Sequence, residues 1–591
     1  MKRNIELPGL PAVILGLCVM LLAARLTIGV DLSDESYYAA FIDGWLKTGI
    51  EHSSNLMVHQ TADLLVYPLA MLFHAVSGGS DGLILFLRSV YLAVATLAST
   101  ALYLAQAKRS GRASGTLVAA CALFFIPFGL PAPSYNTIGM YSLVAALALF
   151  AMHFHFAPAP VEKRLRLPAS LWLSAVSWSF ACVAYPTMLA SLFVLLILGF
   201  LVLKTKADRA FLLRYAIACS ASLAVAAVVL SVIFGLSRLL AMVLFTNAFN
   251  GVSGGFTRKA QFAAAVFATH PRYAFLLICS VVIASLQVSR RFGQLRRWIV
   301  LAGVGIITLG VMTTDSPALF VRSHDLILVL SIIGLFESVR IVTSSDSDRG
   351  ARAFGVIYLV STVAGISTAL TAFNGLYNFP IGGLLSACLA VGSIASTGSD
   401  LSKVLPPLNG ENRQSRLPGR IVGSATCFAI AWSAFTFYYG QGDTPLRQMV
   451  LIHNGAYKGL RTDSELRSFI YKMTDAIDAA SHCGTKFAVL GNGPGFYLMT
   501  MMAPSALSTW SFSGDALNRA ATETSAFYQQ PTSRPDVIVV NNWRWATELS
   551  TSDRTLLQQY SIANRVVVGV RDATVYRRKD CSAVDQRVAH N

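Results

Sequence analysis

The densest group of reactive side chains follows the first apolar segment, where the sequence reads Asp31-Leu32-Ser33-Asp34-Glu35-Ser36-Tyr37-Tyr38. Ser33 is predicted to cap a helix, because serine is a preferred residue at the start of helices. The first turn of this helix would carry Asp34 and Glu35, and carboxylates are stabilised at the positive end of a helix dipole. A carboxylate that stays ionised at neutral pH can act as a general base. The simpler interpretation is that these acids only stabilise the start of the helix, and their spacing leaves both interpretations open.

Aromatic residues continue this segment at helical spacing. Tyr37, Phe41 and Trp45 recur every four residues, so they share one face of the predicted helix. Such a face is typical of the boundary between membrane and water. We therefore expect a helix that lies on the membrane surface and holds the acids just above it.

Three arginines lie inside apolar segments: Arg25, Arg88 and Arg322, the last beside His324 and Asp325. An ionisable residue in a membrane span is costly and commonly marks a site or a partner. A guanidinium group matches the oxygens of a lipid phosphate. The alternative is that these arginines pair with nearby acids or extend to the lipid head groups.

The composition indicates that these side chains belong to a membrane protein. The chain has 591 residues, of which 54% are hydrophobic and 13% charged, with a net charge of +17. About 11% of residues 1–440 are charged and about 19% of residues 441–591. We expect a transmembrane domain at 1–440 with an acidic first external loop at 31–81, followed by a water-exposed domain at 441–591.

Apolar runs long enough to cross a bilayer recur through the first part. The predicted spans lie at about 8–30, 82–107, 114–131, 137–157, 169–187, 188–203, 211–235, 273–289, 298–313, 318–341, 353–372, 377–398 and 421–439. The fold class is thus a polytopic α-helical membrane protein with about thirteen spans. The stretch 64–76 is shorter, and we expect it to lie in the interface or to re-enter the membrane.

Every second loop between these spans is rich in Lys and Arg, as cytoplasmic loops are. Thirteen crossings from a cytoplasmic N-terminus place the C-terminal domain outside the cell. That domain has helical periodicity at about 463–480 and strand-like segments at 486–490, 536–540 and 566–570, so we predict an α/β fold. It contains Cys483 and Cys581, and a disulfide between them requires that the fold bring them together.

The acidic segment resembles a known family. Asp34-Glu35-x-Tyr-Tyr is similar to the acidic first-loop motif of the GT-C glycosyltransferases, which include the protein O-mannosyltransferases and the lipid A aminoarabinose transferases. Tyr135-Asn136 is similar to a Tyr-Asn element of many bacterial members, and Asn374, Tyr377 and Asn378 lie where such enzymes shape the donor cavity. The resemblance covers the layout of most of residues 1–440. The full Asp-Glu-x-x-Phe-Gly form of the mannosyltransferases is absent, which argues against that branch.

The resemblance implies transfer of a sugar from a polyprenyl-phosphate donor to a glycan, lipid or protein acceptor at the outer face of a bacterial inner membrane. Asp34, then Glu35 or Asp31, would act as the base, and direct attack would invert the anomeric carbon. Arg25, Arg88, Arg322 and His324, with Arg258 and Lys259 as further candidates, would bind the lipid phosphate. Tyr37, Tyr38, Tyr135, Asn136, Asn374, Tyr377 and Asn378 would line the substrate cavity.

These residues indicate no definite cofactor, and a divalent metal stays open because metal dependence varies within the class. His52 and His59 are predicted to be solvated loop residues. No nucleic-acid partner is expected. The alternatives are a transporter or flippase for a lipid-linked glycan and a glycan polymerase or ligase.

Overall fold

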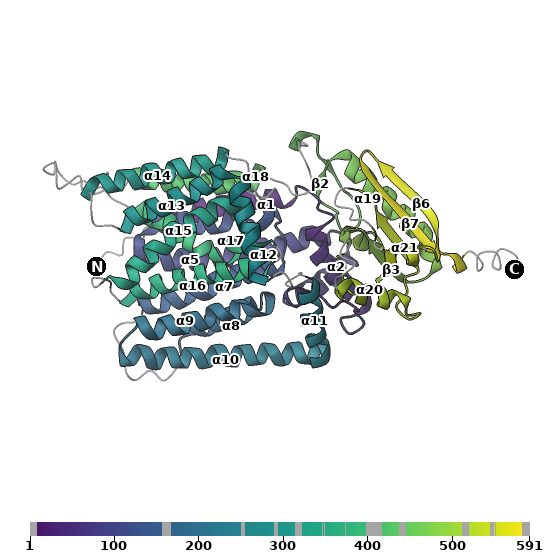
Figure 1. Ribbon diagram of the computed structural model, residues 1–591, viewed down its shortest axis with the longest axis horizontal. Helices are drawn as coiled ribbons and strands as arrows, with labels where there is room; N and C mark the ends of the chain where they lie inside the picture. The colour runs from purple at the N-terminus through teal and green to yellow at the C-terminus, as the bar shows by residue number, and fades with distance from the viewer. Residues whose placement is uncertain are drawn as a thin grey trace.

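The computed structural model describes residues 9–156, 167–249, 255–288, 293–313, 322–344, 347, 349–372, 374–396, 417–436, 445–510, 519–543, 549 and 551–581. A bundle of long helices forms one end of the molecule, and an α/β domain forms the other (Figure 1). The helix α2 (Asp34–Thr48) lies between these two parts.

A helix occupies each of the thirteen predicted spans. They are α1 (Gly9–Leu26), α5 (Leu83–Ser110), α6 (Arg112–Phe124), α7 (Tyr135–Phe156), α8 (Ala169–Ala184), α9 (Met188–Val202), α10 (Lys206–Phe234), α13 (Pro271–Val288), α14 (Gly293–Thr313), α15 (Arg322–Thr343), α16 (Arg349–Thr371), α17 (Phe379–Ser396) and α18 (Leu417–Thr436). Among the described residues, seven helices are long and apolar enough to cross a membrane, or eight if one bent pair counts as a single span. The chain is thus a multi-pass membrane protein, and thirteen crossings stay a prediction.

Shorter elements cover the end of the bundle that faces the α/β domain. They are α2, α3 (Gln60–Leu64), α4 (Tyr67–Ser77), α11 (Leu236–Phe249), α12 (Gly255–Thr269) and the 3₁₀ turns η1 (Pro127–Gly129) and η3 (Gly375–Asn378). The helix α4 falls on the stretch predicted to lie in the interface, and its Leu72 and Val76 are 63% and 80% exposed. An 11-residue helix is too short to cross the hydrocarbon core.

The C-terminal domain contains a five-stranded sheet of order β4-β3-β5-β7-β6, in which β3 pairs in parallel with β4 and β5. The strands are β3 (Lys486–Leu490), β4 (Ala503–Pro504), β5 (Val537–Asn541), β6 (Tyr560–Val568) and β7 (Arg571–Arg578), and β1 (Val450–Leu451) and β2 (Arg461–Thr462) form a separate pair. The helices are α19 (Ser464–Ala480), α20 (Arg519–Gln529) and α21 (Thr551–Leu557), with the 3₁₀ turn η8 (Pro494–Met499). The predicted α/β fold is confirmed.

Two details of this domain follow from its sequence. Asp463 caps α19 by accepting a hydrogen bond from the backbone N–H of Leu466, which satisfies a donor of the first helical turn. Cys483, after α19, and Cys581, after β7, form a disulfide that joins the end of this helix to the end of the last strand. The pairing that the sequence left open is therefore present.

The α/β domain is docked on the segment that carries the acids. The backbone N–H of Gly495 donates to the carbonyl oxygen of Leu32 at 2.9 Å, and the N–H of Gly29 donates to the carbonyl oxygen of Arg461 at 2.9 Å. A side chain added at Gly495 would meet Leu32 and the hydroxyl of Tyr457 within 3.0 Å, so this close approach requires glycine. The domain thus fixes the acidic segment from one side.

Candidate functional site

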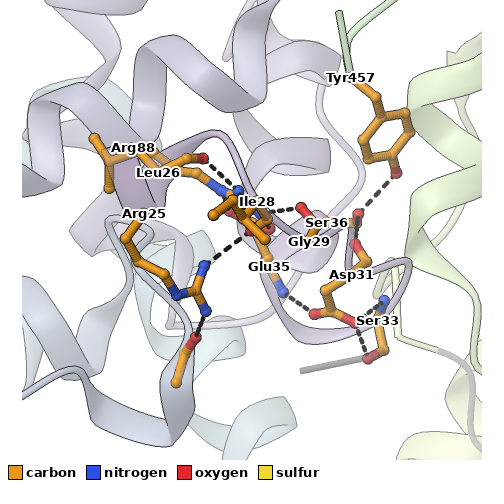
Figure 2. A network of polar contacts seen from close by, with 11 residues as sticks. Arg25, Leu26, Ile28, Gly29, Asp31, Ser33, Glu35, Ser36, Arg88 and Tyr457 are labelled. Carbon is orange, nitrogen blue, oxygen red and sulfur yellow. Dashed lines mark hydrogen bonds and ion pairs between the residues drawn. The ribbon is translucent and has the colours of Figure 1, made fainter. Parts of the chain in front are cut away.

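Asp31 caps α2 in place of Ser33, which corrects the sequence prediction. One carboxylate oxygen of Asp31 accepts hydrogen bonds from the backbone N–H (2.9 Å) and hydroxyl (2.6 Å) of Ser33, and the other accepts from the N–H of Glu35 at 2.7 Å (Figure 2). Ser33 itself makes no side-chain cap bond. Burial and the neighbouring charge of Asp34 raise the pKa of Asp31 to about 7. The hydrogen bonds of Asp31 thus stabilise the turn that precedes α2.

Glu35 is held in a buried ion pair. Both of its carboxylate oxygens accept hydrogen bonds from the guanidinium of Arg88, at 2.6 Å each. Arg88 also donates to the carbonyl oxygens of Leu26, Ile28 and Gly29, so it joins α5 to the end of α1 (Figure 2). This is the pairing with an acid that the sequence left as the alternative to phosphate binding.

Arg25 is likewise used within the fold. Its guanidinium donates to the carbonyl oxygens of Ala434, Ile28 and Gly129, at 3.1, 2.8 and 3.4 Å. The side chain is buried, with 2% of its surface exposed. Arg25 therefore connects α1, α18 and the turn η1.

Asp34 is the partly exposed member of the three acids. Its charge contributes to raising the pKa of Tyr37 and Tyr38, after the larger effect of their burial, so its carboxylate lies near both phenols. It also sits in the first turn of α2, where the helix dipole stabilises the ionised form. The carboxylate is thus placed at an aromatic cluster.

This aromatic cluster consists of Tyr37, Tyr38, His59, Tyr135, Tyr185 and Trp510. The ring of Tyr37 meets that of Trp510 edge-on at 5.7 Å, and Tyr38 lies 5.9 Å from Tyr135. Tyr135 also lies 5.3 Å from Tyr185. The cluster draws rings from α2, the start of α7, the segment after α8 and the α/β domain. Three of its members, Tyr37, Tyr38 and Tyr135, were predicted as lining residues.

His59 belongs to this cluster, so its prediction as a solvated residue is wrong. Its ring stacks on Tyr135 at 4.2 Å, and its Nδ1 lies 3.3 Å from the hydroxyl of Tyr37. Burial lowers the pKa of His59 to about 4, so the ring is neutral at pH 7. His52, in contrast, is exposed as predicted, with 72% of its side chain accessible.

His324 holds two turns together. The backbone N–H of Phe128 donates to Nε2 of His324 at 2.8 Å, and Nδ1 lies 2.9 Å from the carbonyl oxygen of Tyr377. Nε2 therefore accepts and Nδ1 carries the proton, which fixes a neutral tautomer. Phe128 has a left-handed backbone (φ 56°), which is unusual for a bulky residue. His324 thus connects η1 to η3, and both ring nitrogens are occupied.

The remaining predicted cations lie elsewhere on the same end of the bundle. Arg322 is exposed and donates to the carbonyl oxygen of Met312, and Lys259 donates to the carbonyl oxygen of Leu370. The side chain of Arg258 lies outside the described residues.

The predicted Asn and Tyr residues fall into two groups. Asn136 is buried at the start of α7, next to Tyr135. Asn374 precedes η3, and Tyr377 and Asn378 lie in it. The hydroxyl of Thr368 donates to the carbonyl oxygen of Asn378 at 2.8 Å. The hydroxyl of Tyr185 donates to the backbone carbonyl oxygen of Thr368 at 3.4 Å. The turn η3 is thus connected to the aromatic cluster through α16.

Among the described residues, one group of three has potential ligand atoms close enough together to bind a metal ion: His482, Cys483 and Cys581. Both of these cysteines are already joined in the disulfide. The acidic segment therefore presents no set of three ligands at metal-binding distance among the described residues.

Sequence comparison finds no matching protein-family model and no matching curated protein. Solved structures do match. The oligosaccharyltransferase of Archaeoglobus fulgidus, tethered with an acceptor peptide, superposes with a TM-score of 0.52 at 11% identity, over 93% of this chain and 72% of that one. The same organism's AglB, in complex with an inhibitory peptide and a dolichol-phosphate, superposes with a TM-score of 0.50 at 11% sequence identity. This match covers 90% of this chain and 69% of that one. ArnT from Cupriavidus metallidurans superposes with a TM-score of 0.47 at 12% sequence identity, over 95% of this chain and 97% of that one. The two matches at 0.50 and above extend over nine-tenths of the chain, so the chain shares the fold of these oligosaccharyltransferase structures.

Proposed function

We propose that this protein is an integral-membrane glycosyltransferase that moves a sugar from a polyprenyl-phosphate donor to an acceptor at the outer face of the membrane. The observation that carries the proposal is the position of Asp34, a partly exposed carboxylate whose charge acts on Tyr37 and Tyr38. Asp31 caps a helix and Glu35 neutralises Arg88, whereas Asp34 is partly exposed beside the aromatic cluster. The GT-C fold supports the same class of reaction.

Asp34 acts as the general base in this proposal. It takes the proton of an acceptor hydroxyl while the hydroxyl oxygen attacks the anomeric carbon. The bond between that carbon and the phosphate oxygen breaks, and its electron pair leaves with the polyprenyl phosphate, so the configuration inverts. Fixed positive charge assists the departing phosphate, and Arg322 and Lys259 are the described cations that we assign to it.

The α/β domain contributes directly to the proposed site. Trp510 places its ring against Tyr37, and the hydroxyls of Ser36 and Tyr457 lie 2.8 Å apart across the interface between α2 and the domain. We propose that this domain faces the periplasm of a bacterial inner membrane. The acceptor, whether glycan, lipid or protein, then approaches from the domain side and the donor from the lipid.

The test is sugar transfer by the purified protein in lipid nanodiscs, with polyprenyl-phosphate sugars as donors. Wild type should form a covalent product, Asp34→Asn should not, and Glu35→Gln should lose activity together with thermal stability. Full activity of Asp34→Asn would remove the mechanism. Movement of labelled donor across vesicles without any covalent product would favour a flippase instead.

A further inference from the structure

A second carboxyl group at the aromatic cluster is used by none of the interactions described above. Asp63 lies in the short helix α3, four residues after His59, and its side chain is fully buried. Neither of its carboxylate oxygens has a hydrogen-bond partner. Within the described residues, no cationic side chain forms an ion pair with it.

An ionised carboxylate in this position would be very unfavourable. Removing a charge from water without a counter-ion or a hydrogen bond costs far more than a protein's net stability, so the group takes up a proton instead. The described arginines Arg88 and Arg238 have other partners: Arg88 binds Glu35, and Arg238 donates to the carbonyl oxygens of Ile50 and Ser53. Burial accordingly raises the pKa of Asp63 well above its ordinary value.

The neutral form changes what Asp63 can do. A protonated carboxyl offers one O–H donor, whereas an ionised one only accepts. A buried donor without an acceptor is itself costly, which points to a partner that is absent from the unliganded protein. An oxygen of a bound molecule would satisfy it.

The position of Asp63 indicates where the oxygen of such a bound molecule would lie. After the larger effect of burial, the charges of both Asp34 and Asp63 raise the pKa of Tyr37 and of Tyr38. The two carboxyl groups therefore border the same pair of rings. This relationship was not predicted, because Asp63 stands apart from the acidic motif in the sequence.

We propose that Asp63 works as a neutral acid, donating a hydrogen bond to an oxygen of the substrate bound beside Tyr37 and Tyr38. This inference rests on the proposed function. A neutral carboxyl can lie against either a phosphate oxygen or a sugar hydroxyl, whereas an ionised one repels phosphate. The oxygens of Asp63 are covered in this state, so substrate binding requires that a covering side chain move.

The first test uses infrared difference spectroscopy, which reads protonation without any activity. Wild type minus Asp63→Asn at pH 7 should show the carbonyl band of a protonated carboxyl, and wild type minus Asp34→Asn should not. A shift of the Asp63 band on adding undecaprenyl phosphate alone identifies a phosphate partner. A shift only with a sugar-bearing donor identifies a sugar hydroxyl. Absence of the protonated band, or a band that neither ligand shifts, would overturn the inference.

The second test compares variants in the transfer assay. Asp63→Asn keeps a neutral donor and should retain activity within about threefold, whereas Asp63→Ala should lose about tenfold to about a hundredfold. Equal losses in both variants would overturn the inference, since they indicate that the negative charge is required. If Asp34→Asn stays active while the Asp63 band behaves as expected, the assignment of the base fails and that of Asp63 stands.

Discussion

Arg88 holds both carboxylate oxygens of Glu35 at 2.6 Å, in a pair whose side chains are 3% and 2% exposed. The same guanidinium binds the carbonyl oxygens of Leu26, Ile28 and Gly29. Glu35 therefore provides the negatively charged partner of Arg88, a role that was expected for a lipid phosphate. The turn between α1 and α2, which sets the position of Asp34, is built around this pair.

Breaking this pair should destabilise the protein. Glu35→Gln or Arg88→Met leaves one buried charge without its partner, which typically costs about 3–5 kcal/mol. We expect a clear fall in the melting temperature of the purified protein, measured by intrinsic fluorescence. The matched control is Arg565→Gln, which removes an exposed partner of Asp572 and should change little. Equal melting temperatures for all three variants and wild type would contradict this role of the pair.

Asp34→Asn should affect activity and leave stability unchanged. Removing a general base commonly lowers kcat by about a hundredfold to about ten-thousandfold. Asp34 is partly exposed, so the melting temperature should stay near that of wild type. Asp81→Asn is a suitable control, because Asp81 is an exposed acid that contacts Lys458. A large stability loss in Asp34→Asn would instead support the structural interpretation of this acid.

Most of the fold could be predicted from the sequence, because long apolar runs leave few choices other than membrane helices. A helix lies at every predicted span, and the predicted strand at 486–490 is β3. The last of the predicted strands was placed too late, at 566–570, whereas β6 spans Tyr560–Val568. Its exposed, polar middle lacks the apolar run that marks a buried strand.

The site was predicted in part, because its members are joined by contacts between distant segments. The acidic motif and its tyrosines are local in sequence and were found. Trp510 reaches Tyr37 across 473 positions of the chain, and such a contact leaves no pattern in a single sequence. The roles of Asp63 and His59 were missed, because the burial of Asp63 and the ring contacts of His59 depend on how α3 packs against α2 and the start of α7.

Stability should depend on pH through Asp31. Its pKa is about 7 in the folded protein against 3.8 for an ordinary aspartate, owing to burial and then to Asp34. Between these values the folded state carries a proton that the unfolded chain has lost, so stability decreases as the pH rises through this window. Asp31→Asn keeps an oxygen that can accept from the N–H of Glu35 but cannot titrate. The melting temperature of wild type should fall more steeply with rising pH than that of this variant. Parallel pH profiles would rule out the proposed titration.

Trp510 should affect the reaction more than the fold. It is partly exposed, and its ring packs edge-on against Tyr37. An aromatic pair of this kind contributes about 0.5–1.5 kcal/mol, so Trp510→Ala should lower the melting temperature only slightly. We expect a rise in KM for the acceptor, with a smaller change in kcat, because the lost ring borders the proposed acceptor position and takes no proton. Trp510→Phe should restore most of the affinity. Trp432→Ala, which removes a 51% exposed ring from α18, is the matched control and should leave KM unchanged. If Trp510→Ala changes neither constant, the α/β domain serves only to fix the acidic turn.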